Sequence, residues 1–272
     1  MIAINIKGDL SFGVPPEPMS KACADFYLEH VRLFTFLRFV QETSCGNDLD
    51  KLIAKKALND TAEPEEQKRY TSLVSHNLDT IRQFFSHQPL LLEMLYCRYI
   101  DTYLNYITGF LTTVFIHRPD TLRSNDTITV SEVLEYRNFD ELIRYIADKR
   151  VHQLSYKGFF DLTKYVSEKL GFELISQKDD FNRLRVIIEI RNLITHNRGI
   201  VNEIFLSRTS EVTWKYGDKI TLSTDEVISV IALLTRLVRD IEIRGAKKFN
   251  YKQEVISKEE VVYNYLKLTQ IV

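Results

Sequence analysis

The sequence predicts an all-α fold, and two observations carry that prediction. Apolar residues recur at spacings of three and four along most of the 272 residues, which places them on one face of a helix. Residues that start and stop helices, such as serine, proline and glycine, stand at the ends of these runs. We expect a helical bundle with an N-terminal helical extension and a small β-hairpin between the last two core helices.

Residues 1–62 are expected to form an arm and a helical extension. The first part holds two glycines and three prolines around a short alternating run at 2–6, which is typical of a flexible arm or an edge strand. Ser20 can cap a helix that Gly46 stops. A shorter, charged helix and a linker follow over 47–61.

Residues 63–250 are expected to form the main bundle, which opens with a helix over 65–117. Pro64 suits the first turn of that helix, and Pro89 is expected to break it. Its second half carries a stripe of tyrosines at spacings of three and four: Tyr96, Tyr99, Tyr103 and Tyr106. The stripe indicates packing in a core or an interface, and a platform on which RNA bases stack is the alternative. Pro119 ends the unit.

The middle of the bundle is expected to contain a brief strand and two helices. The strand is Thr127–Val130, and a helical turn starts at Ser131. The helices follow over 140–154 and 157–170, and Gly171 ends the second.

Four further elements are expected after this unit. They are a helix over 182–196, a hairpin over 211–222, a core helix over 227–243 and a C-terminal helix within 251–272, amphipathic over 256–270. Gly217 and Asp218 form the turn of the hairpin. Ser223, followed three positions later by Glu226, starts the core helix.

The stretch most informative about function is residues 189–199, Glu-Ile-Arg-Asn-Leu-Ile-Thr-His-Asn-Arg-Gly. It places an arginine, an amide and a histidine within a few turns of an otherwise apolar helix. Arg191 keeps its charge and offers a fork of donors to phosphate oxygens. His196 carries an imidazole, the group best suited to acid–base work near neutral pH. Together these groups can bind a phosphodiester and move a proton.

Polar residues on this helix gather in a narrow stripe opposite a broad apolar side. The stripe consists of Arg185, Glu189, Asn192 and His196. Asn192 and His196 lie four positions apart, so the amide can hold the imidazole in one orientation. Glu189 could extend that network.

Arg191 instead projects from the apolar side, where a charge is costly unless it is paired or lines a wet cleft. An ion pair with an acid elsewhere in the chain is one explanation. Arg191 and His196 are also about 140° apart around an ideal helix. They meet on one phosphate only if the helix end distorts near Gly199 or if a second copy contributes. We favour a two-fold dimer, which hides the apolar side and pools two sets of groups.

The run Arg191-Asn192-Leu193-Ile194-Thr195-His196 resembles the Arg-Asn-x-x-x-His signature of the HEPN superfamily of ribonucleases and RNA-binding domains. It is most similar to RiboL-PSP-type HEPN proteins of bacterial defence and stress systems. The likeness spans residues 70–245 and is sharp over 187–201. It implies a helical bundle that dimerises through the motif helix. It also implies metal-independent cleavage of RNA, in which the 2′-hydroxyl attacks the neighbouring phosphate and leaves a 2′,3′-cyclic phosphate.

By the same resemblance, His196 is the expected general base or acid, and Arg191 stabilises charge in the transition state. Asn192 is expected to position one of them. Neighbouring polar residues are expected to bind substrate: Arg185, Glu189, Thr195, Asn197 and Arg198. In related toxins that are silenced by nucleotidylation, a tyrosine follows the histidine by two positions. Arg198 stands at that place in this chain, so the same control is not expected.

The expected function is therefore a metal-independent endoribonuclease that acts as a toxin or an anti-phage defence effector. Its expected partners are RNA, a second copy of the chain, and an antitoxin or defence-system protein. The alternative is a non-catalytic HEPN-type module that binds RNA or a protein. A helical scaffold whose Arg191 makes a salt bridge is a third possibility.

The composition and residue spacing argue against several other classes of function. The net charge of −1 gives no basic field over the whole protein, although residues 181–200 hold four arginines and a single acid. Nine dispersed glycines build no phosphate-binding loop. The three cysteines and the scattered histidines lack metal-ligand spacing, so neither a metal nor a cofactor is expected. With no leader or membrane-spanning run and with reduced thiols, we expect a cytoplasmic protein.

Overall fold

The computed structural model describes residues 16, 18–61, 63–68, 79–123, 127–209 and 213–251. These residues lie in helices, turns and loops, which confirms the all-α prediction. The named helices are α1 (Lys21–Thr61), α3 (Asp79–His117), the 3-10 helix η1 (Pro119–Leu122), α4 (Val130–Leu134), α5 (Phe139–Tyr156), α6 (Phe159–Leu170), α7 (Lys178–Asn197), α8 (Glu203–Arg208) and α9 (Thr224–Phe249). Residues 64–68 are also helical.

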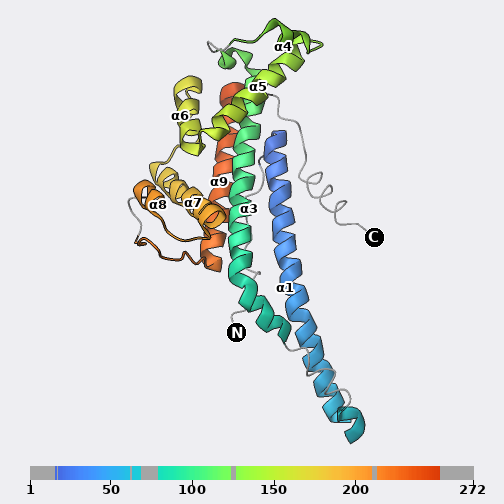
Figure 1. Ribbon diagram of the computed structural model, residues 1–272. Helices are drawn as coiled ribbons and strands as arrows, with labels where there is room; N and C mark the ends of the chain where they lie inside the picture. The colour runs from blue at the N-terminus through green and yellow to red at the C-terminus, as the bar shows by residue number, and fades with distance from the viewer. Residues whose placement is uncertain are drawn as a thin grey trace.

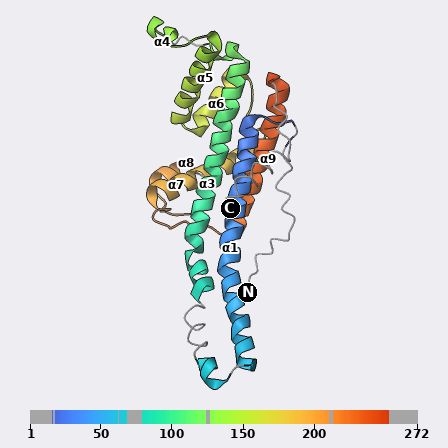
Figure 2. The same cartoon turned by 90° about the vertical axis from the view of Figure 1, so that its right-hand side faces the viewer.

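The long helix α3 is the centre of the fold, and the other helices are arranged around it (Figure 1). Helices α1 and α9 run along α3 and pack against it. Helix α7 crosses α3 at a steep angle, with α8 beside it, as both views show (Figures 1 and 2). Helix α5 packs near one end of α3, whereas the far half of α1 projects from the opposite end. The motif helix is therefore held across the middle of the bundle.

Aromatic side chains of α3 fill the core. Tyr103, Phe110 and Phe115 are completely buried. All four tyrosines of the predicted stripe are buried as well, which confirms the packing interpretation and leaves no exposed platform for bases. Helix α9 comes close to Phe110 at Gly245, where a Cβ atom would lie 2.4 Å from the Cε2 atom of the Phe110 ring. This crossing has room only for glycine.

A buried carboxylate joins the start of α1 to α9. Glu242 accepts hydrogen bonds from the Ser20 backbone N–H at 2.6 Å, from the Ser20 hydroxyl at 2.9 Å and from the Tyr106 hydroxyl at 3.2 Å. The Ser20 hydroxyl accepts in turn from the Cys23 backbone N–H at 3.2 Å, which confirms Ser20 as the cap of α1. The first turns of α1 thus pack into the same core as α3. A domain boundary after residue 62 stays a prediction.

Several helix ends confirm the local sequence signals. Ser223 and Glu226 form a capping box at the start of α9, in which each side chain accepts the backbone N–H of the other. Gly171 ends α6 in a left-handed conformation, at φ 58°. Gly158 separates α5 from α6, and α3 ends just before Pro119.

The predicted hairpin over 211–222 is wrong for its described part, residues 213–222, which contain no strand. This segment turns back on itself but pairs with the residues that follow α7. A single antiparallel bridge joins Ile200 to Lys219. The alternation of apolar residues in this segment predicted strands. In the structure it instead places Ile220 in the core, where this side chain is buried.

Two helices run through residues that the sequence predicts as interruptions. Helix α1 continues past Gly46, because one glycine costs a helix only about 1 kcal/mol. Helix α3 continues past Pro89, and its first part is bent in Figure 1. The strand predicted at Thr127–Val130 is also wrong, because Thr129 caps α4 in a capping box with Glu132.

Two predicted elements, the run at 2–6 and the helix at 256–270, lie outside the described residues. Within the described part of the chain, no helix combines the length and the apolar character that spanning a bilayer requires.

Burial of His30 should make the stability of the fold depend on pH. Its ring lies near those of Phe26 and Tyr99, with centroids 6.4 and 5.5 Å away, and burial lowers its pKa from 6.5 to about 4. Between these values the unfolded chain binds a proton that the folded chain does not, so stability falls as the pH is lowered through this window. We expect this group to remove about 2 kcal/mol between pH 7 and pH 5.

The measurement compares the denaturation midpoints of the wild type and of His30→Phe, which keeps a ring at this position. The variant should lose less stability over the same pH range. Parallel losses in the two proteins would contradict the assignment to His30.

Candidate functional site

Helix α7 carries the arginine, amide and histidine of the motif. It begins at Lys178, earlier than predicted, with acidic residues in its first turn, where negative charge favours a helix start. Asp180 accepts hydrogen bonds from both terminal nitrogens of Arg236 on α9, at 2.9 and 2.7 Å, and this pairing lowers the pKa of the carboxyl group. The Tyr96 hydroxyl of α3 donates to the Ile187 carbonyl at 3.1 Å. The helix is thereby fixed to both α9 and α3.

Helix α7 stays regular to its end. Its last helical residue is Asn197, and Arg198 adopts a left-handed backbone conformation at φ 55°. The Asn197 side-chain amide donates to the Ile200 carbonyl at 2.5 Å, which holds the turn that follows. The distortion that could have brought Arg191 and His196 together within one chain is therefore not present in this helix.

Arg191 is anchored to the protein and is not free in solvent. Its Nη2 donates to Asp101 Oδ1 of α3 at 2.6 Å, and its Nη1 donates to Asn192 Oδ1 at 3.1 Å. The Arg191 side chain is 23% exposed and that of Asp101 is 35% exposed. The Arg191 Nε is buried and has no hydrogen-bond partner among the described residues. The ion pair that the sequence left open as an explanation of this arginine is thus present.

His196 lies on the outer side of α7. Its side chain is exposed, and it makes no hydrogen bond or ion pair with any described residue. The predicted hydrogen bond between Asn192 and His196 is not formed, and the Asn192 amide oxygen binds Arg191. The imidazole can therefore approach a ligand or a second protein molecule.

Sequence reasoning missed three residues of α3: Cys97 and Asp101, which contact the motif helix, and Glu93, which is joined to its end through Lys219. They stand four positions apart and so share one face of α3. The Cys97 Sγ lies 3.9 Å from the Thr195 Oγ1, and burial raises the pKa of this thiol. Glu93 accepts from Lys219 at 3.0 Å, and Lys219 also donates to a backbone carbonyl at the end of α7. Their spacing within a tyrosine-rich helix was the one signal that could have found them.

The other residues predicted to bind substrate do not all share a surface. Arg185 is exposed, with its guanidinium 5.5 Å from the centroid of the Phe160 ring. Glu189 is buried and accepts from Arg208 at 3.2 Å. Because Arg208 ends α8, that helix shields Glu189 and keeps it from a network with Asn192. Thr195 and Arg198 are exposed, and the Asn197 side chain holds the turn after the helix as described above.

One face of α7 is open to solvent over part of its length. Arg185, Thr195 and His196 are exposed on it, and Asn192 and Arg191 are half-buried at its edge. Leu184 and Ile188 on the same face are buried in the core. At about 100° per residue, these positions fall within an arc of about 140°. A face with two guanidinium groups, an amide, a hydroxyl and an imidazole can bind an anion and move a proton.

Comparisons of the chain with protein-family models, with curated proteins and with solved structures found no match. Among the residues that the structure describes, no three or more histidine, cysteine, aspartate or glutamate side chains are grouped so that they could hold a metal ion. The assignment of a function therefore rests on α7 and its neighbours.

Removing the anchor of Arg191 should destabilise the fold slightly. Asp101→Asn replaces an ion pair by a hydrogen bond from the guanidinium to a neutral amide oxygen, in a partly exposed setting. We expect a loss of about 1 kcal/mol in the free energy of unfolding, measured by urea denaturation. Asp120→Asn is the matched control, because Asp120 makes an exposed ion pair with Arg118 at 3.0 Å and should tolerate the change. Equal stability of Asp101→Asn and the wild type would show that the pair anchors nothing.

Proposed function

We propose that this protein is a metal-independent endoribonuclease of the HEPN type that cleaves RNA as a homodimer. The observation that carries the proposal is the open face of α7, on which the exposed imidazole of His196 and the half-buried guanidinium of Arg191 both lie. These are the two groups to which the HEPN resemblance assigns the catalytic roles. Only RNA can react in this way, because DNA lacks the 2′-hydroxyl that attacks the phosphate.

The guanidinium of Arg191 can contact a phosphate without leaving its anchor. Two of its N–H groups bind Asp101 and Asn192, and each terminal nitrogen keeps a second N–H. The side chain is 23% exposed, so a ligand can reach it from solvent. Negative charge that develops on the phosphate oxygens would meet a donor that is already fixed in place, which is the most effective form of electrostatic stabilisation.

The imidazole of His196 supplies the proton transfer. In one protonation state it takes the proton of the attacking 2′-hydroxyl, and in the other it gives a proton to the leaving 5′-oxygen. Asn192 positions Arg191, since its amide oxygen accepts from that guanidinium. Arg185 and Thr195 on the same face would bind the neighbouring phosphate and ribose groups.

A single chain does not bring the two groups to one phosphate. Helix α7 is regular up to Asn197, and about 140° of rotation separates Arg191 from His196. Two copies that pair through their open faces about a two-fold axis would place His196 of one protomer beside the partner's Arg191, at two equivalent sites. The proposed chemistry therefore requires the dimer.

The biological role within this proposal is that of a cytoplasmic toxin or anti-phage defence effector, held in check by a partner protein. The likeness of residues 187–201 to RiboL-PSP-type HEPN proteins supports this role.

The non-catalytic candidates are a module that binds RNA or a protein and a helical scaffold, and the ion pair of Arg191 favours the scaffold. An arginine with a carboxylate 2.6 Å away is also explained by a structural role. In that case the substitution of Arg191 would lower stability and would have no activity to remove.

Substitution of either proposed group should remove RNA cleavage from a folded protein. We expect His196→Ala and Arg191→Ala each to slow cleavage at least about 100-fold in the presence of EDTA, measured with a fluorescent RNA. His87→Ala and Arg118→Ala are matched controls, because both side chains are exposed elsewhere on the protein, and they should keep the wild-type rate. Undiminished cleavage by His196→Ala would sink the proposal. A wild type that cleaves no RNA, with variants that lose only stability, would favour the non-catalytic module.

Mixing the two inactive variants tests whether the site is shared between protomers. In a heterodimer of His196→Ala with Arg191→Ala, one of the two sites keeps both groups. Random exchange of subunits should then restore about a quarter of the wild-type rate. No recovery after subunit exchange would place both groups of each site in the same chain.

A further inference from the structure

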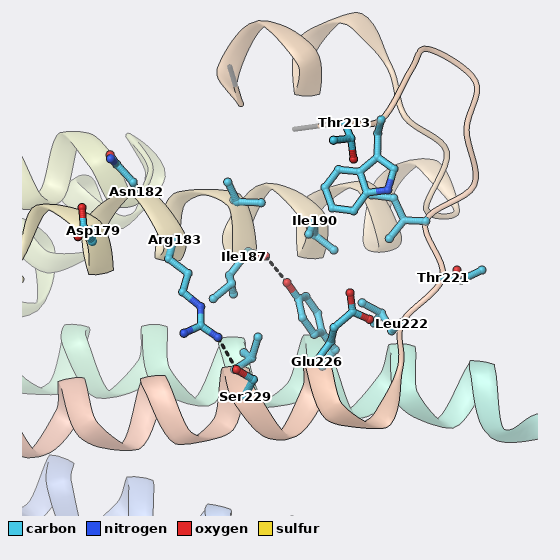
Figure 3. Close-up of a pocket in the computed structure, with 15 residues that line it drawn as sticks. Asp179, Asn182, Arg183, Ile187, Ile190, Thr213, Thr221, Leu222, Glu226 and Ser229 are labelled. Atoms are coloured by element: carbon cyan, nitrogen blue, oxygen red, sulfur yellow. Dashed lines mark hydrogen bonds between the residues drawn. The ribbon is translucent and has the colours of Figure 1, made fainter. Parts of the chain in front are cut away.

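A cavity of ≈ 640 Å³ lies beside α7 (Figure 3). At about 100° per residue, the α7 residues that line it fall on a different side of the helix from the open face. It is bounded by α7, by residues 220–222 of the following loop and by the first turns of α9, and Tyr96 of α3 forms part of its floor. Its volume falls in the range of about 300–1,000 Å³ that is typical of small-molecule sites.

The inner wall of this cavity is apolar and suits a planar ring. It is formed by the side chains of Tyr96, Val186, Ile187, Ile190, Ile220, Leu222 and Val230, together with the indole of Trp214. Trp214 is half-buried, and its ring centroid lies 5.8 Å from that of Phe205 behind it. The indole is thereby held in place while part of its surface remains available for contact with a ligand.

A cation and an anion stand on opposite sides of the apolar wall (Figure 3). Arg183 reaches from α7 to the Ser229 hydroxyl of α9 and makes no ion pair with any described residue. Glu226 accepts from the Ser223 backbone N–H and hydroxyl, both at 2.7 Å, and both bonds go to Oε2. Its Oε1 is left to accept from a ligand. Asp179 also lines the cavity, four positions before Arg183, and it is exposed, as Arg183 and Glu226 are.

We propose that this cavity binds a nucleotide whose base carries an exocyclic amine. The base lies against the Trp214 indole, its amine donates to Glu226, and the phosphate contacts Arg183. The two ends of such a ligand match the two charges, and its ring matches the wall between them. Uracil binds more weakly, because it presents a carbonyl oxygen where cytosine presents the amine, and a carboxylate repels that oxygen. This binding site goes beyond the proposed nuclease and does not depend on it.

The test uses the fluorescence of Trp214, the one tryptophan in the chain. Cytidine 5′-monophosphate should change this fluorescence saturably, and uridine 5′-monophosphate should bind at least about tenfold more weakly. Absence of a saturable response to the cytidine nucleotide, or equal affinity for the two nucleotides, would overturn the proposal.

Two variants test which residue contacts each end of the ligand. Arg183→Gln should weaken the binding of cytidine 5′-monophosphate about tenfold and leave that of cytidine, which has no phosphate, unchanged. Glu226→Gln can still form the capping box but lacks the charge, so the preference for cytosine over uracil should disappear. Glu132→Gln is the matched control, because Glu132 caps α4 in the same way and lines no part of this cavity. Unchanged affinities in Arg183→Gln would contradict the assignment of the phosphate.

The outcome is separable from that of the nuclease proposal, because nucleotide binding is read without any cleavage. A protein that cleaves RNA but shows no response of Trp214 would keep the proposed function and lose this site. A protein that binds the nucleotide but cleaves no RNA would do the reverse.

Discussion

The pairing of Arg191 with Asp101 fixes how the motif helix meets the central helix. The two side chains join α7 to α3 at 2.6 Å, at the place where the helices cross, and Asn192 holds the guanidinium from its own helix. A charge at this half-buried position requires a partner. Arg191 therefore has two roles: it joins the two helices, and it is the proposed phosphate-binding group. The guanidinium is therefore held in place by the protein itself, and under the proposed function a phosphate would share it with Asp101. In this arrangement α3 positions the proposed catalytic centre as well as filling the core.

Three sides of α7 have different surroundings. One side packs on α3 and is tied by Tyr96 and Asp101. A second side is open and carries His196 at its outer edge. A third side borders the cavity that we assign to a nucleotide. The protein as a whole is nearly neutral, with a net charge of −1, so any attraction of α7 for a polyanion would be local and would act over about 10 Å at ordinary salt concentration. Under the proposed function, the substrate would therefore be a short stretch of RNA and not a long duplex.

The features that the sequence could predict are those decided by neighbouring residues. The capping box of Ser223 and the end of α6 at Gly171 depend on side chains or backbone freedom within a few positions. The continuation of α1 through Gly46 and the loop in place of a hairpin depend on packing against distant elements, which local signals do not contain. The same distinction between local and distant contacts applies to the candidate site. The Arg191–His196 run was visible as a motif, whereas Asp101 is distant in the sequence and meets Arg191 only in the fold. Glu189 looked exposed because the helix that covers it, α8, was not predicted.

The most direct test of the nuclease account is the chemistry of the RNA ends. Purified protein is incubated with an RNA in the presence of EDTA, and the products are identified by mass spectrometry. Attack by the 2′-hydroxyl, with His196 moving the proton and Arg191 holding the phosphate, gives a 2′,3′-cyclic phosphate on one fragment and a 5′-hydroxyl on the other. Fragments that end in a 3′-hydroxyl and a 5′-phosphate, or cleavage that EDTA abolishes, would contradict the account.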